Sequence, residues 1–242
     1  MRQKNLPIPM TWGWRVAVIA TILVVFGNVA GVATGPNVVT VSWAAVAQSA
    51  GTVLIVIVGS RWCRLTLAEV GIGRTNLLRS SLIGAGIGLG LAAVVLVALK
   101  VGAELGTPIT YQPLRGAAIL AIVTHALLGL PLLTAIPEEL AFRGLMLGLL
   151  VRKLTPLRAT LVTSATFVAW HVVVQVQTLA VTNFTGPWQI VPAMGLAFAG
   201  LFAGGVIFAL LRLRTRNLAG AVVAHWLFDA GLITGLFFLT HS

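Results

Sequence analysis

Long apolar runs constrain the fold of this chain more than any other feature. A membrane-spanning helix needs about 20 mostly apolar residues, and seven stretches are long enough, at about 14–35, 39–59, 80–101, 116–136, 158–178, 189–211 and 218–239. A further apolar piece, 139–151, is too short to span a bilayer alone. Charged residues make up only 9% of the 242 residues, against about a quarter in soluble domains. The sequence therefore predicts an all-α, polytopic membrane helix bundle.

The basic residues predict the orientation of this bundle. Thirteen of the 16 Lys and Arg residues lie in segments that one alternating topology places on the same side, namely 2–15, 60–79, 152–158 and 212–217. Because Lys and Arg concentrate in cytoplasmic loops, the N-terminus should be cytoplasmic and the C-terminus outside. We expect an integral protein of a prokaryotic plasma membrane. The net charge of +11 then reflects topology, and we expect no nucleic-acid partner.

The stretch 116–151 must cross the membrane only once for this topology to hold. Its 36 residues would form a straight helix of about 54 Å, and Pro131 and Pro137 offer places for a break. We therefore expect a crossing helix and then a second helical piece that starts near Glu138 and stays within protein on the inner side. The bundle would have seven net crossings and about eight helices, with N-terminal membrane helices in 1–115 and a catalytic helical core in 116–242.

Two features of the spans bear on packing. The first span has the flanks of a signal peptide, but its apolar run is long for one, so we interpret it as an uncleaved helix. Small residues at a spacing of four allow helices to approach closely in lipid, and we expect such packing within the monomer at several glycine pairs, namely Gly84/Gly88, Gly86/Gly90, Gly144/Gly148 and Gly200/Gly204.

Ionisable residues within membrane spans are costly and usually functional. Three of the five acidic residues, Glu138, Glu139 and Asp229, lie in or beside apolar stretches. Glu139 is four residues before Arg143, and Asp229 is four residues after His225, so each pair lies on one helix face.

Adjacent residues on a helix point about 100° apart. Glu138 and Glu139 should therefore differ in role, one pairing with Arg143 and the other facing the bundle interior. His125 is a further intramembrane histidine, which we interpret as one that is hydrogen-bonded to a neighbouring helix.

The polar residues should also share a depth. At about 1.5 Å per residue, Glu138, His171, His225 and Asp229 lie about 14–21 Å from the inner basic residues. Three separate helices thus deliver polar groups to one level. This convergence predicts one buried site that opens to the cytoplasmic side.

The chemistry of this set points to hydrolysis by water. A carboxylate in a low-dielectric pocket can act as general base, a nearby histidine can hold the water, and a second histidine can stabilise an oxyanion. Glu138, His171 and His225 would equally make a catalytic zinc set with an open position. No serine or cysteine near them lies in a nucleophile motif.

Two other functions use similar residues. Histidines and carboxylates also form relays in proton-coupled transporters, although we find no convincing internal repeat of the kind from which many transporters are built. A non-catalytic immunity or scaffold protein could retain the same site.

Three motifs in this order resemble the CPBP (CAAX protease and bacteriocin-processing) family of intramembrane endopeptidases, also called Abi proteins. They are Glu138-Glu139…Arg143, Phe167…His171 and His225…Asp229, and the resemblance covers about 116–240. It implies a helical membrane bundle with a site open to the cytoplasm, in which Glu138 and His171 activate water.

The resemblance further places His225 and position 229 near the scissile carbonyl, with Glu139, Arg143 and Phe167 in support. Asp229 stands where many relatives have Asn. It would then be protonated, orient His225 or bind a metal.

The expected partners are membrane lipids and a peptide or membrane-protein substrate. The family's best-known substrates are prenylated C-terminal tails, and its members are called metalloproteases, yet a metal-free glutamate–water mechanism fits the same residues. The sequence leaves open the substrate's identity, metal dependence and oligomeric state.

Overall fold

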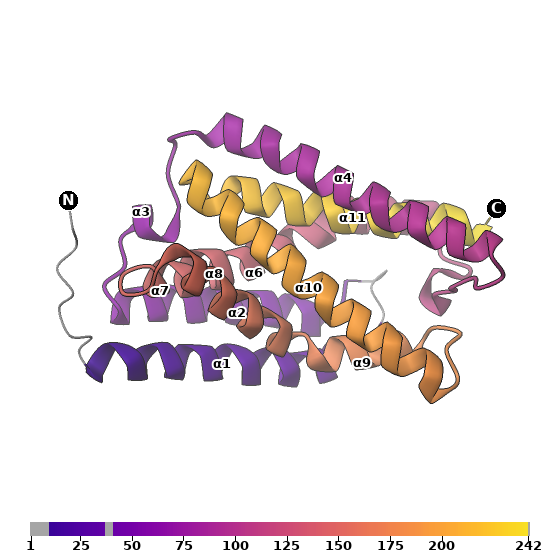
Figure 1. Ribbon diagram of the computed structural model, residues 1–242, viewed down its shortest axis with the longest axis horizontal. Helices are drawn as coiled ribbons and strands as arrows, with labels where there is room; N and C mark the ends of the chain where they lie inside the picture. Colours follow the sequence, from indigo (N-terminus) through magenta and orange to yellow (C-terminus); the bar gives the residue numbers. More distant parts are fainter. Residues whose placement is uncertain (1–9, 37–40, 242) are drawn as a thin grey trace.

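The computed structural model describes residues 10–36 and 41–241, and this part of the chain is all-helical (Figure 1). Six of its helical stretches are long and apolar enough to cross a membrane: α1 (Met10–Thr34), α2 (Trp43–Trp62), α4 (Leu77–Glu104), the stretch Ile119–Leu150, α10 (Pro187–Thr215) and α11 (Ala219–His241). A seventh span results if α8 (Pro156–Trp170) and α9 (Val172–Ala180), bent by 47°, are counted together. The predicted polytopic helical bundle is therefore confirmed.

The stretch Ile119–Leu150 differs from our expectation of a break at Pro131 or Pro137. It runs without interruption through α5 (Ile119–Thr124), η2 (His125–Ala135), α6 (Ile136–Glu139), η3 (Leu140–Met146) and α7 (Leu147–Leu150). The segments η2 and η3 are π-helical, and the amide of Ile136 donates to the carbonyl of Pro131, five residues earlier. The wider turns accommodate a proline ring that would clash with the preceding turn of an α-helix. The prediction of two separate helical pieces was wrong.

The loops divide between the two ends of the bundle. The α2–α4 connection with α3 (Leu67–Val70), the α7–α8 turn and the α10–α11 turn lie at the end where α1 begins (Figure 1). The three basic segments 60–79, 152–158 and 212–217 consist of these connections and the helix ends next to them. At the opposite end, where α11 finishes, η1 (Gln112–Leu114) and the residues before it pair with the α9–α10 loop, through an isolated bridge between Tyr111 and Thr182.

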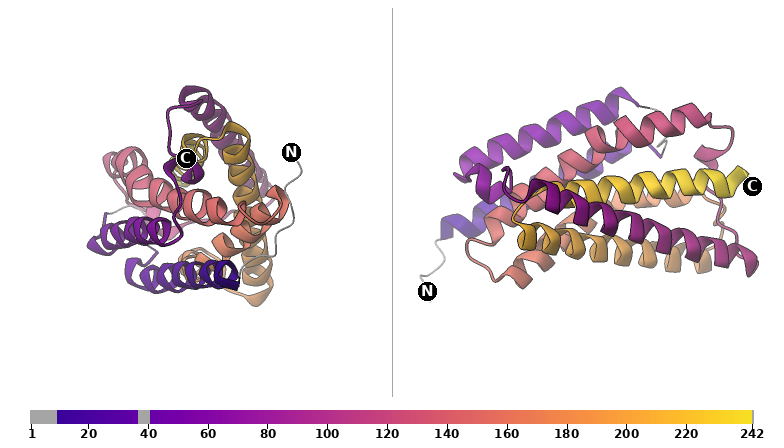
Figure 2. Two further views of the ribbon diagram at one scale, coloured as in Figure 1. Left: turned by 90° about the vertical axis from the view of Figure 1, so that its left-hand side faces the viewer. Right: turned by 90° about the horizontal axis from the view of Figure 1, so that it is seen from above.

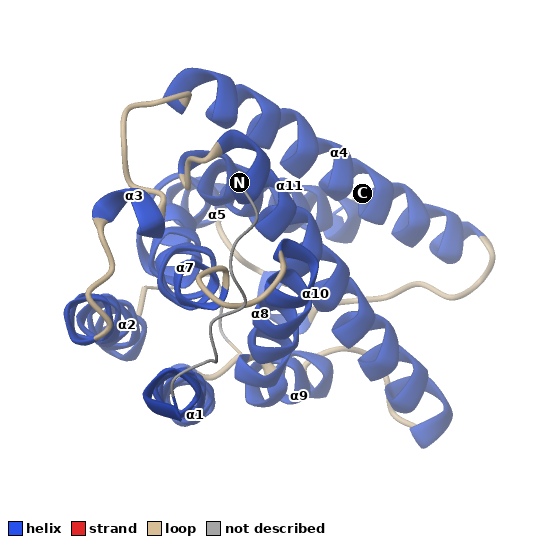
Figure 3. Cartoon of the chain, turned by 60° about the vertical axis from the view of Figure 1, so that its left-hand side comes forward, coloured by secondary structure: helices blue, strands red, loops and turns tan. Residues whose placement is uncertain are grey.

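The second half of the Ile119–Leu150 stretch forms the centre of the bundle. Its residues from Ala141 to Leu150 are all buried, and the apolar side chains among them join the largest hydrophobic core, together with residues of α1, α2 and α8. In Figure 3, α7 is seen end-on among α1, α2, α3 and α8. Helices from the first 115 residues therefore pack directly on those that follow.

The helices α4 and α11 lie side by side along most of their lengths (Figure 2). A Cβ atom at Gly84 would lie 2.2 Å from the carbonyl oxygen of Gly220, and one at Gly88 would lie 2.3 Å from that of Ala224. Both glycines thus allow backbone contact between the two helices, as we predicted.

The other glycine pairs behave differently. Cβ atoms at Gly144 and Gly148 would meet residues of α3, a surface element, rather than a membrane helix. At the pairs Gly86/Gly90 and Gly200/Gly204, an added Cβ would have no described atom within 4 Å, so the expected close approach is absent there.

Candidate active site

The two adjacent glutamates occupy the last positions of α6, between the two π-helical segments. Such segments often mark functional sites in helices. Both side chains are buried, and they contact different partners, as their separation around the helix predicted. Glu138 approaches His171, and Glu139 binds Arg143 and His225.

His171 lies at the bend between α8 and α9. Its Nδ1 is 2.8 Å from the carbonyl oxygen of Phe167. Because a carbonyl oxygen only accepts, Nδ1 must carry a hydrogen and donate. In the neutral ring, Nε2 is then an acceptor, and it lies 3.5 Å from Oε2 of Glu138. That oxygen is buried and has no hydrogen-bond partner among the described residues.

Asn28 of α1 holds this bend in place. Its amide nitrogen donates to the carbonyl of Ala169 at 2.8 Å, and its amide oxygen accepts from the backbone N–H of Val173 at 2.9 Å. The side chain therefore satisfies two backbone groups on either side of His171, where the helix is interrupted. Our sequence reasoning missed this residue, although a lone asparagine in an apolar span was a visible signal.

His225 of α11 lies between two carboxylates. Its Nδ1 is 2.9 Å from Oε1 of Glu139, and its Nε2 is 3.3 Å from Oδ2 of Asp229. The imidazole also stacks on Phe208 of α10, with ring centroids 5.6 Å apart. Phe208 carries no polar signal, and we did not predict it.

Arg143 is fully buried and contacts Glu139. It donates from Nη1 to Oε1 of Glu139 at 2.8 Å, and its guanidinium lies 4.3 Å from the ring centroid of Phe167 and 5.6 Å from that of Phe208. A buried charge requires such compensation from an opposite charge and from aromatic faces.

The structure thus gathers the predicted residues around one buried cluster, namely Glu138, Glu139, Arg143, Phe167, His171, His225 and Asp229. His125 differs from our expectation, because both its ring nitrogens are buried without a hydrogen-bond partner in the described part of the chain. Our interpretation of a histidine bonded to a neighbouring helix was wrong there.

The same geometry tests whether a metal fits. No group of three or more His, Cys, Asp or Glu side chains in the described residues is arranged to hold a metal ion. In particular, both ring nitrogens of His225 are engaged by carboxylate oxygens outside the Glu138–His171 pair, Nδ1 by Glu139 and Nε2 by Asp229. The proposed zinc set of Glu138, His171 and His225 does not fit this arrangement.

The short helix α3, which we call the strap, supports the buried second half of the Ile119–Leu150 stretch at the basic end of the bundle. Arg152, after α7, binds both carboxylate oxygens of Glu69 in α3, at 2.7 and 2.8 Å. These bonds from Arg152 lower the pKa of Glu69 to about 2. Arg212 of α10 donates to the backbone carbonyl of Glu69. Cys63, next to the strap, is buried, and burial raises the pKa of its thiol, as expected for an inert cysteine.

Comparison with known proteins agrees with the resemblance of the three motifs. A family model described as type II CAAX prenyl endopeptidase Rce1-like matches residues 116–231, which contain every member of the buried cluster. No curated protein matches the chain. No solved structure matches it either.

Proposed function

We propose that this chain, whose residues 116–231 belong to the Rce1-like family of CAAX prenyl endopeptidases, hydrolyses a peptide bond with a water molecule activated by Glu138 and His171. The family supports a CAAX-type intramembrane endopeptidase. The observation that carries the mechanism is the buried Oε2 of Glu138, which has no hydrogen-bond partner among the described residues and lies 3.5 Å from Nε2 of His171. Leaving such an oxygen without a partner costs about 1–3 kcal/mol or more, which a bound water would offset.

The hydrogen bond from His171 to Phe167 decides how that water is held. It leaves Nε2 as an acceptor next to an acceptor carboxylate, so one water can donate one hydrogen to each. Two acceptors bridged in this way lie about 4.4 Å apart. The present distance of 3.5 Å between the two acceptors therefore has to widen by about 1 Å when the water binds. The lone pairs of the water then face a substrate carbonyl.

Proton transfer follows from this placement. Glu138 takes a proton as the water oxygen bonds to the carbonyl carbon, which creates a tetrahedral oxyanion. The same proton passes to the leaving nitrogen as the C–N bond breaks. This cycle returns Glu138 to its ionised form and uses no group beyond the chain, the water and the substrate.

His225 supplies the positive charge in this scheme. With a carboxylate oxygen facing each ring nitrogen, both nitrogens donate when the ring is an imidazolium. Glu139 is fully buried, and Asp229 is at the partly exposed edge, with the longer contact of 3.3 Å. We propose that a substrate oxyanion takes the place of Asp229 on Nε2, whereas Glu139 keeps the ring in position.

The test uses purified protein in liposomes and a peptide that ends in a farnesylated CAAX sequence, with mass spectrometry of the released C-terminal tripeptide. A transmembrane peptide without the farnesyl group serves as a second substrate. Glu138→Gln should reduce turnover about 10²–10⁴-fold, the usual contribution of a general base. Arg158→Gln, at an exposed position on α8, is the matched control. Equal turnover by Glu138→Gln and wild type would overturn the mechanism.

A further inference from the structure

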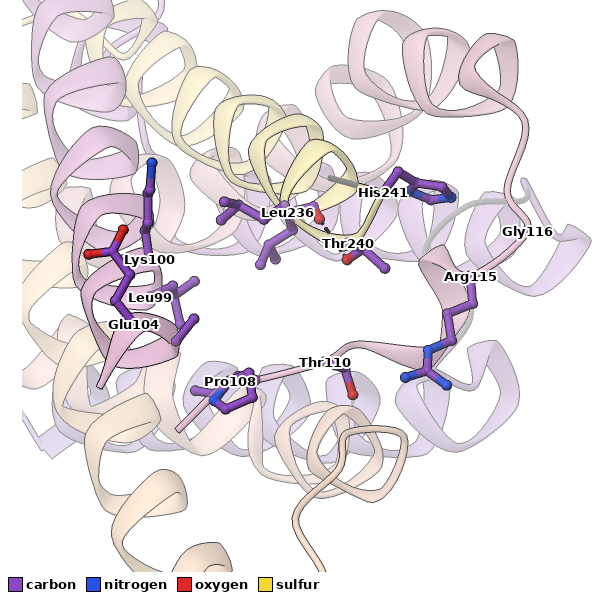
Figure 4. A pocket seen from close by; sticks show the side chains of 13 residues that line it. Leu99, Lys100, Glu104, Pro108, Thr110, Arg115, Gly116, Leu236, Thr240 and His241 are labelled. Atoms are coloured by element: carbon purple, nitrogen blue, oxygen red, sulfur yellow. Dashed lines mark hydrogen bonds between the residues drawn. The ribbon is translucent and has the colours of Figure 1, made fainter. Parts of the chain in front are cut away.

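A cavity at the opposite end of the bundle from the strap is not used by the proposed chemistry. It has a volume of about 690 Å³. Its walls come from the last turns of α4, the 105–118 connection and the last turns of α11 (Figure 4). Apolar side chains make up part of the lining, among them Leu99, Pro108 and Leu236.

Hydrogen bonds with residues that do not line the cavity hold the 105–118 segment in place. Asn183 accepts from the backbone N–H of Thr110 at 3.0 Å and donates to the carbonyl of Pro108 at 2.8 Å. Tyr111 donates its hydroxyl to the carbonyl of Pro36 at 2.7 Å. Burial raises the pKa of Tyr111 to about 12. The cavity therefore has a packed wall rather than a loose loop.

The basic residues around the cavity lie at the opposite end of the bundle from most other basic residues. The other basic residues that the structure describes lie at the far end, apart from Arg143 in the buried cluster. The two remaining ones, Lys100 and Arg115, both line this cavity. Cations on this side run against the usual bias of membrane proteins, so their common position calls for a local cause.

The net charge of the lining indicates the ligand's charge. Lys100 and Glu104 are four residues apart on α4 and have opposite charges, which leaves Arg115 as the unbalanced one. No described residue makes a hydrogen bond or ion pair with the Arg115 side chain, and Figure 4 shows its guanidinium on the same side as Thr110. A guanidinium and a hydroxyl that line one cavity suit a phosphate group.

We propose that this cavity binds one anionic phospholipid, with its phosphate at Arg115 and Thr110 and an acyl chain along Leu99 and Leu236. The position fits, because the last turns of two membrane helices lie at the depth of lipid head groups. A single negative charge matches the unbalanced arginine. Basic pockets between membrane helices bind lipid head groups in this way.

The experiment is a titration of detergent-purified, full-length protein with phosphatidylglycerol, followed by native mass spectrometry. Wild type should bind one lipid, and Arg115→Gln should weaken this binding about tenfold or more, the value of a charged hydrogen bond. Glu104→Gln should bind as tightly as wild type or more tightly, because it removes the opposing charge. Arg158→Gln, an exposed arginine at the other end, should leave the affinity within twofold.

Two further ligands separate the sources of the phosphate. Phosphatidylcholine has the same phosphate without net charge and should bind more weakly than phosphatidylglycerol. Inorganic phosphate should not displace the lipid, because it makes no use of the apolar wall. Equal binding by Arg115→Gln and wild type, or complete displacement by inorganic phosphate, would overturn the proposal. Neither result depends on peptide cleavage, so a failure of the lipid proposal can be distinguished from a failure of the proposed peptidase function.

Discussion

Substitution of Gly88 by alanine tests whether the α4–α11 contact positions the candidate active site. The new Cβ would lie 2.3 Å from the carbonyl oxygen of Ala224, and ordinary contact begins at 3.4 Å, so α11 must move by about 1 Å. Ala224 directly precedes His225, whose Nδ1 is 2.9 Å from Glu139. If α11 moves by this amount along the direction of that contact, the distance between His225 Nδ1 and the Glu139 carboxylate increases to about 4 Å, beyond hydrogen-bond range.

The expected cost follows from this displacement. Overpacking of this kind destabilises by about 1–3 kcal/mol, partly offset by about 0.5–1 kcal/mol that alanine gains over glycine within a helix. A misplacement of 1 Å at a catalytic group can reduce the rate about 10²-fold. Gly88→Ala should therefore lose about 100-fold in peptide cleavage, with only a modest decrease in thermal stability.

Gly90 provides the matched control, because it lies on the same helix and a Cβ added to it would have no described atom within 4 Å. Gly90→Ala should keep wild-type cleavage and gain slightly in stability. Both variants are measured by cleavage in liposomes and by thermal unfolding in detergent. If Gly88→Ala cleaves the peptide as fast as Gly90→Ala, α11 is not held in register by this contact, and the reasoning fails.

Two further predictions concern single acidic residues. Glu69→Gln should lower the melting temperature at pH 7, because the variant lacks the carboxylate that binds Arg152. The pKa of Glu69 is lowered from 4.5 to about 2, so the stabilisation by this ion pair is fully present above about pH 4.5. The melting temperatures of the two proteins should therefore converge as the pH falls through about 2. With both side chains about one-third exposed, the difference should be about 1 kcal/mol. Asp229→Asn keeps an acceptor that positions the His225 ring before substrate binds and should cleave within about tenfold of wild type, whereas Asp229→Leu removes that acceptor and should lose about 10²-fold through misplacement of the ring; equal rates for the two variants would contradict the proposed contact.

The spans could be predicted from the sequence because the bilayer imposes a length and an apolar composition on each of them. The gathering of Glu138, His171 and His225 followed for a related reason. Ionisable side chains in apolar helices avoid lipid and face the interior, so three such helices direct their polar groups to one place. Family resemblance added the expected roles.

Other features depend on contacts that the sequence does not specify. Gly84/Gly88 and Gly86/Gly90 have the same spacing on α4, yet only the first pair contacts another helix. The proline-containing stretch Ile119–Leu150 stays continuous because π-helical turns accommodate Pro131, and hydropathy carries no information about this. The stacking of Phe208 on His225 is likewise decided by tertiary packing.

The residue at position 229 shows how exposure decides the charge balance of a membrane site. In the proposed mechanism Glu138 is an ionised base, Glu139 and Arg143 form a neutral pair, and His225 is a cation, so the site is uncharged when position 229 is neutral. Asp229 adds a negative charge, which is costly in a dry site. Its side chain is 26% exposed, whereas that of Glu139 is 0% exposed, so water at the edge of the site can stabilise the added charge. Asparagine at position 229 would remove this charge while it keeps the acceptor for His225.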